Sequence, residues 1–154
     1  MYSILCISFT SDTYNEVKDV QYSVPIAIGI ILYAVISPIV EEIIFRGLTY
    51  TRMKQFFNRK LSIIVVSFMF GAFHGNIVQG IYAFILGILI TLAYDWTTSF
   101  WGAILFHASA NLAIYLLSVT PLGKINFVTP ISCALFGTIS ILFGFILYKS
   151  CKKD

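Results

Sequence analysis

The chain contains a nearly unbroken apolar run from Val24 to Val40 that leads directly into two adjacent glutamates, Glu41 and Glu42. A helix needs about 20 predominantly apolar residues to cross the hydrocarbon core of a bilayer, and this run with its continuation to Tyr50 exceeds that length. The whole chain is 58% hydrophobic and 11% charged, whereas soluble domains carry about 25% charged residues. The sequence therefore predicts an integral membrane protein.

The remaining apolar sequence is divided into further blocks of similar character. Hydrocarbon leaves backbone groups no partner outside the segment, so each block is expected to be a helix. The predicted fold is an all-α, polytopic transmembrane helix bundle of about five spans. We divide the chain into a polar N-terminal segment (1–22), a core (23–120), and a final transmembrane helix with a basic tail (121–154). The five blocks are Val24–Tyr50, Leu61–His74, Ile77–Trp96, Ser99–Val119 and Val128–Tyr148.

Positive charges gather at two places outside these blocks, which predicts the orientation. By the positive-inside rule both places are cytoplasmic, and five spans then place the C-terminus inside the cell. Segment 51–60 is either an amphipathic helix at the membrane interface or an ordinary connector. The net charge of +3 and the lack of a basic, aromatic patch away from the membrane flanks argue against a nucleic-acid partner. The charges are Arg52, Lys54, Arg59 and Lys60 in the first connection, and Lys149, Lys152 and Lys153 in the tail.

Few ionisable side chains fall within the predicted spans. Such residues are rare in lipid and commonly mark functional sites, so each needs a named partner. Asp95 lies at a helix end and is interpreted as interfacial. The others are Glu41, Glu42, Arg46 and both histidines of the chain, His74 and His107.

Spacing distinguishes the two glutamates. Residues four apart share a face of a helix, so Arg46 aligns with Glu42 and the two neutralise one another. Glu41 is turned about 100° away, which leaves it free to accept a proton as a general base. The alternative is that all three residues form one structural ion cluster.

The histidines extend this polar cluster to two further helices. His74 follows Phe70 at four-residue spacing, and His107 precedes Asn111 at the same spacing. In lipid the most favourable partners for such groups are one another. We therefore expect one polar pocket within the bundle.

Helix rise gives a rough depth for each member of this pocket. At 1.5 Å per residue, Glu41 and His107 lie about 12–13 Å below the cytoplasmic face, whereas His74 lies near 20 Å. The expected pocket is thus in the cytoplasmic half, with His74 too deep. Pro38 lacks an N–H group and is expected to free the carbonyl of Ala34.

Three motifs occur in order on successive helices: EExxxR (Glu41, Glu42, Arg46), FxxxH (Phe70, His74) and HxxxN (His107, Asn111). Together they resemble the CPBP family of CAAX-protease and bacteriocin-processing membrane proteins, also called the Abi family, which includes the Ras-converting CAAX prenyl endopeptidase. The resemblance covers roughly residues 30–117. It implies an intramembrane endopeptidase that hydrolyses a peptide or protein substrate, with or without a lipid group, within the bilayer.

The resemblance also implies roles for the site residues. Glu41 would activate a water with the assistance of His74, while His107 and Asn111 would stabilise the oxyanion. Glu42 and Arg46 would hold the architecture as a structural ion pair. The expected catalytic set is Glu41, Glu42, His74, His107 and Asn111.

The metal requirement is left open by these residues. Two histidines and a glutamate with an open fourth position form a known catalytic zinc set, and the family is often labelled metalloprotease. It has also been described as a glutamate-dependent protease without a metal, and the chain has no HExxH. A divalent metal such as zinc is therefore one alternative, and no cofactor is the other.

Family members usually have further transmembrane helices before the EExxxR segment, whereas residues 1–23 precede its apolar block here. This indicates a small form in a bacterial cell membrane, linked to bacteriocin processing or self-immunity. A non-catalytic immunity or adaptor protein that keeps the fold is the main alternative. A small transporter is the other, because Glu and His also mark proton pathways, although no internal repeat supports it.

Overall fold

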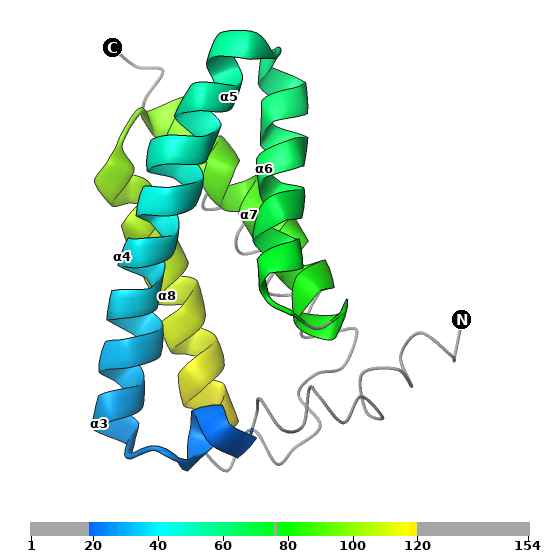
Figure 1. Ribbon diagram of the computed structural model, residues 1–154. Helices are drawn as coiled ribbons and strands as arrows, with labels where there is room; N and C mark the ends of the chain where they lie inside the picture. The colour runs from blue at the N-terminus through cyan, green and yellow to red at the C-terminus, as the bar shows by residue number, and fades with distance from the viewer. Residues whose placement is uncertain (1–18, 76, 120–154) are drawn as a thin grey trace.

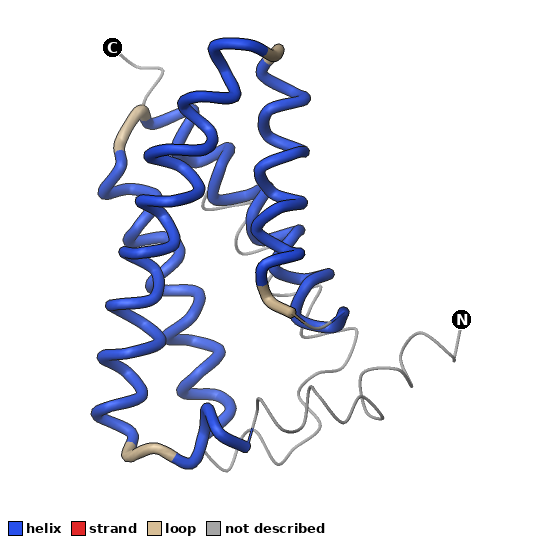
Figure 2. Tube along the Cα trace, viewed as in Figure 1, coloured by secondary structure: helices blue, strands red, loops and turns tan. Residues whose placement is uncertain are grey.

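The computed structural model describes residues 19–75 and 77–119. Within these residues every regular element is a helix, and short turns join the helices (Figures 1 and 2). Three of the helices are long and apolar enough to cross a membrane. The predicted helical membrane bundle is thus confirmed. The block Val128–Tyr148 and the basic tail lie outside the described residues, so the count of five spans stays a prediction.

The first membrane helix is continuous from Ile26 to Phe56. It starts after Pro25, whose backbone is extended, and ends where Phe57 becomes extended. Its 31 residues exceed the about 20 that a span needs. Along its length the helix changes between α and π geometry, in the order α3 (Ile26–Gly29), η1 (π, Ile30–Ile36), α4 (Ser37–Glu42), η2 (π, Ile43–Tyr50) and α5 (Thr51–Phe56).

The π-helical stretch η1 affects which backbone carbonyls lack a helical hydrogen-bond donor near Pro38. The N–H of Ser37 bonds the carbonyl oxygen of Leu32, five residues back. The next bond in this register would join Pro38 to Tyr33, and proline has no N–H to donate. The π register thus adds the carbonyl of Tyr33 to that of Ala34, whose release stays a prediction.

Helices α6 (Arg59–Phe73) and α7 (Ile77–Thr97) form an antiparallel hairpin. The side chain of Asn58 caps α6 by accepting the N–H of Leu61. At the other end Gly75 has a φ of +72°, a conformation that glycine adopts without steric cost. The helices come closest at Gly71, where an added Cβ would lie 2.6 Å from the carbonyl oxygen of Gly80.

The continuation of the first helix to Phe56 resolves the depth problem of His74. Glu41 lies 15 residues, about 22 Å, from that end, and the 15 residues of α6 place His74 about 22 Å from the same end of the bundle. Figure 1 shows that the hairpin reaches only part of the way along the first helix and α8. His74, which ends α6, therefore lies at the level of the other polar residues rather than beyond them.

Helix α8 (Phe100–Val119) packs against η1, α4 and α7. Its Tyr115 lies against Gly29, where an added Cβ would be 1.8 Å from the hydroxyl oxygen. The observed helices α7 and α8 reproduce the predicted blocks to within one residue at each end.

The basic connection contains no separate interfacial helix. Residues 51–56 continue the first helix as α5 and α6 begins at Arg59, so only Phe57 and Asn58 connect the two helices. Asp95 of α7 stabilises this end: it accepts hydrogen bonds from Tyr50 (2.8 Å) and Lys54 (2.6 Å), and another from Arg59. Asp95 is therefore a structural anchor.

Candidate active site

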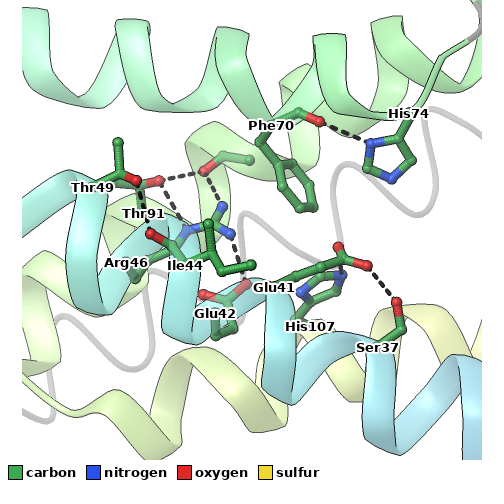
Figure 3. Close-up of polar contacts among 11 residues, drawn as sticks. Ser37, Glu41, Glu42, Ile44, Arg46, Thr49, Phe70, His74, Thr91 and His107 are labelled. Carbon is green, nitrogen blue, oxygen red and sulfur yellow. Dashed lines mark hydrogen bonds and ion pairs between the residues drawn. The ribbon is translucent and has the colours of Figure 1, made fainter.

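The ion pair predicted between Glu42 and Arg46 is present and fully buried. Arg46 Nη1 donates to Glu42 Oε1 at 2.6 Å, and both side chains are 0% exposed. The guanidinium also donates to two groups of α7, Thr91 Oγ1 (3.3 Å) and the carbonyl oxygen of Gly87 (3.0 Å). Its Cζ lies 4.8 Å from the centre of the Phe70 ring. Arg46 therefore fastens α7 and α6 to the first helix (Figure 3).

His107 of α8 lies between the two glutamates. Its Nδ1 is 2.8 Å from Glu42 Oε1, and its Nε2 is 3.8 Å from Glu41 Oε2. Because the ionised Glu42 carboxylate only accepts, His107 Nδ1 carries the proton of that bond. The distance to Glu41 is too long for a hydrogen bond. One oxygen of Glu42, Oε1, thus serves both Arg46 and His107, whereas its other oxygen, Oε2, is buried without a hydrogen-bond partner among the described residues.

Glu41 has a different environment. The hydroxyl of Ser37, one helical turn earlier, donates to Glu41 Oε1. Glu41 Oε2 is buried and has no hydrogen-bond partner among the described residues. A buried carboxylate oxygen without a partner is costly. Glu42 Oε2 is in the same condition, so the two glutamates differ in that Glu41 lines the pocket described below and Glu42 does not.

His74 faces the same region from the end of α6 (Figure 3). Its Nδ1 lies 2.8 Å from the carbonyl oxygen of Phe70. A carbonyl only accepts, so Nδ1 carries the hydrogen, and in the neutral ring Nε2 keeps its lone pair. The Phe70 ring contacts both histidines edge-on, with centroids 5.0 Å from His74 and 5.5 Å from His107. Phe70 thereby spaces the two imidazoles.

Asn111 lies one turn beyond His107 on α8. Its Nδ2 donates to the carbonyl oxygen of Tyr33 at 3.0 Å, the carbonyl that Pro38 leaves without a helical partner. The NH2 group has two N–H bonds, and this contact uses one of them.

Glu41, His74 and Asn111 line one pocket of about 230 Å³. Glu42 is not part of its wall, consistent with its structural contacts. The pocket extends from Glu41 toward the end of the bundle opposite the basic connection, which differs from the expected cytoplasmic position. Its walls come from the face of the first helix that carries residues 33, 37 and 41, and from α7 and α8. The lining residues are Gln21, Tyr22, Tyr33, Ser37, Glu41, His74, Gln79, Tyr82, Asn111, Ile114 and Tyr115.

A catalytic zinc site needs three protein ligands that converge on one point. Across residues 19–75 and 77–119, no three His, Cys, Asp or Glu side chains converge closely enough to hold a metal ion. The arrangement does not fit a three-ligand zinc site, and we derive no step through a metal.

Sequence reasoning missed three groups that support the site. Ser37 could have been found from its four-residue spacing to Glu41, which places both on one helical face. Thr91 and Gly87 could not be found in this way, because nothing in the α7 sequence indicates that they meet Arg46.

Comparison with known proteins agrees with this arrangement. A family model described as type II CAAX prenyl endopeptidase Rce1-like matches residues 23–113, which is more than half of the chain and includes every candidate site residue. The chain belongs to this family. The resemblance inferred from the three motifs is thereby confirmed, and the molecule is an integral membrane protein of a peptidase family.

YdiL of Bacillus subtilis (strain 168), a candidate membrane peptidase by its name, is 25% identical to the chain over 120 residues. The aligned part covers 78% of this chain and 48% of YdiL, so the chain spans about half the length of this relative. No solved structure matches the chain.

Proposed function

We propose that the chain is an intramembrane endopeptidase in which Glu41 activates a water for attack on a peptide bond. The observation that supports this proposal most directly is that two adjacent carboxylates have different surroundings. Glu42 pairs with Arg46 and His107 and lies outside the pocket wall, whereas Glu41 hydrogen-bonds Ser37 and lines the pocket together with His74 and Asn111. Membership in a peptidase family supports the same chemistry.

The proposed reaction needs one water and one peptide carbonyl in the pocket. Glu41 takes a proton from the water while Nε2 of His74 accepts the second O–H as a hydrogen bond. The resulting hydroxide attacks the carbonyl carbon, and the carbonyl oxygen becomes an oxyanion. When the C–N bond breaks, Glu41 returns the proton to the departing amine nitrogen. Atoms and charge balance without any further reactant.

Asn111 and His107 are proposed to stabilise the oxyanion. The second N–H of the Asn111 amide is the more direct donor, because Asn111 belongs to the pocket wall. His107 is buried 3.8 Å from Glu41 and lies outside the pocket wall, so it is the less direct donor.

The substrate is proposed to be a peptide or protein segment, either CAAX-type or bacteriocin-related, that reaches the pocket within the bilayer. The similarity to a Bacillus subtilis protein agrees with a bacterial form.

A second candidate function is a non-catalytic immunity or adaptor protein. One observation favours it: several polar contacts of the cluster join different helices, as in the bonds from Arg46 to Gly87 and from Asn111 to Tyr33. Interhelical hydrogen bonds in membranes contribute about 0.6 kcal/mol on average. Association alone does not account for Glu41, which lines the pocket and, among the described residues, hydrogen-bonds only within its own helix.

Terminus-mapping mass spectrometry tests the proposal. Membranes of cells that produce the wild type are compared with those that produce Glu41→Gln at matched protein levels. We expect new peptide C-termini with the wild type that are absent with Glu41→Gln. As a matched control, Asp19→Asn neutralises an exposed carboxylate outside the pocket and should leave the wild-type peptides in place. Identical peptide sets for wild type and Glu41→Gln would support the adaptor function instead.

A further inference from the structure

Pro38 interrupts the hydrogen bonding of the first membrane helix beside the pocket. In the π register of η1, the N–H of Ser37 bonds Leu32, and the following position is Pro38, which has no N–H. The carbonyl oxygen of Tyr33 is consequently left for another donor. Pro38 itself is buried and lies one turn before Glu42.

The donor that takes this place is the side chain of Asn111, at 3.0 Å from α8. A carbonyl oxygen only accepts, so the nitrogen and not the oxygen of the amide must face Tyr33. The contact therefore fixes which way the Asn111 amide is turned, a choice that an unbonded amide would leave open. Its second N–H is left for the pocket that Asn111 lines with Glu41.

We propose that Pro38 is a positioning residue for the oxyanion donor: it frees the Tyr33 carbonyl, which in turn orients the Asn111 amide toward the reacting carbonyl. This inference rests on the proposed function, because it gives Asn111 its task there. Donors aimed in advance at a developing charge need no rearrangement during the reaction, which is the main source of their effect. In this role Pro38, in the interior of a membrane helix, affects turnover through Asn111.

The substitution Pro38→Ala tests this link, because alanine restores an N–H that competes for the Tyr33 carbonyl. We expect kcat to fall by about 10- to 100-fold, part of the about 10²–10³-fold that loss of a whole oxyanion donor costs. KM should stay unchanged, since the wall of the pocket is otherwise intact. Pro38→Ser restores the same N–H and serves if the alanine variant does not fold. Pro25→Ala, at the start of α3 outside the pocket, is the control and should keep wild-type turnover.

A double-mutant cycle separates positioning from a merely structural role. If Pro38 acts through Asn111, then Pro38→Ala lowers kcat in the wild type and has no further effect in Asn111→Ala. Equal losses in both backgrounds would overturn the inference. So would wild-type kcat for Pro38→Ala while Asn111→Ala is impaired, and that result would leave the proposed function standing. Wild-type turnover of Asn111→Ala would reject the oxyanion role itself, and the inference with it.

Discussion

The two adjacent glutamates of the first helix have different surroundings, and the difference lies in the contacts that their carboxylate oxygens make. Glu42 meets Arg46 and His107 within 2.8 Å and is wholly buried. Among the described residues Glu41 hydrogen-bonds only the Ser37 hydroxyl, and it lines the pocket, which Glu42 does not. Removing each charge by an isosteric change should therefore have different consequences.

Glu42→Gln should destabilise the protein, because it leaves the Arg46 guanidinium buried without its counter-ion. Breaking a buried pair by removing one partner costs about 3–5 kcal/mol. Glu41→Gln should change stability little, because the amide keeps an oxygen for the Ser37 hydroxyl. Unfolding of the purified variants in detergent, followed by heat or denaturant, measures both. Equal stability of the two variants would contradict the assignment of Glu42 as the structural carboxylate.

Among the secondary-structure elements, the positions of the helices could be predicted from the sequence, but their hydrogen-bond registers could not. Long apolar runs determine α7 and α8 almost to the residue, because lipid forces such runs to be helical. The pairing of Arg46 with Glu42 could likewise be predicted, because residues four apart lie on the same face of a helix. The π geometry of η1, by contrast, is not indicated by any residue spacing, and it leaves the Tyr33 carbonyl for Asn111. The depth of Glu41 likewise depends on the first helix continuing to Phe56.

The α6–α7 hairpin presents His74 to the pocket and depends on close backbone contact at Gly71. An added Cβ there would lie 2.6 Å from the Gly80 carbonyl, so Gly71→Ala must push the helices apart. Overpacking of this kind costs about 1–3 kcal/mol, and the shift should lower turnover by moving His74. The control is Gly47→Ala, whose Cβ would find its nearest neighbour at an ordinary 3.6 Å.

Turnover and thermal stability of these two glycine variants, measured together, check this expectation. Gly47→Ala should match the wild type in both. A Gly71→Ala variant as active and as stable as Gly47→Ala would mean that the hairpin is not held at this contact.

For the whole molecule, the pocket and the basic connection lie toward opposite ends of the first helix. The connection is fixed by Asp95 with Lys54 and Arg59, whereas the pocket extends toward Gln21 and Tyr22. A helix of 31 residues spans the bilayer once. Residues 20 and 56 should therefore be exposed on opposite sides of the membrane, with residue 56 cytoplasmic by the positive-inside rule.

Cysteine labelling tests this topology. Val20→Cys and Phe56→Cys replace side chains that are 69% and 76% exposed, each in a background where Cys6, Cys133 and Cys151 are serine. A membrane-impermeant maleimide should label residue 20 in intact cells and residue 56 only after permeabilisation. Labelling of both positions from the same side would show that the first helix does not cross the membrane.

The central claim is that Glu41 activates a water. Its most direct test is cleavage of an identified substrate peptide by purified protein in ¹⁸O-labelled water, comparing wild type with Glu41→Gln of matched thermal stability. We expect one ¹⁸O atom in the new C-terminus with the wild type and no cleavage with the folded variant. Continued cleavage by Glu41→Gln, with the label incorporated as in the wild type, would contradict it.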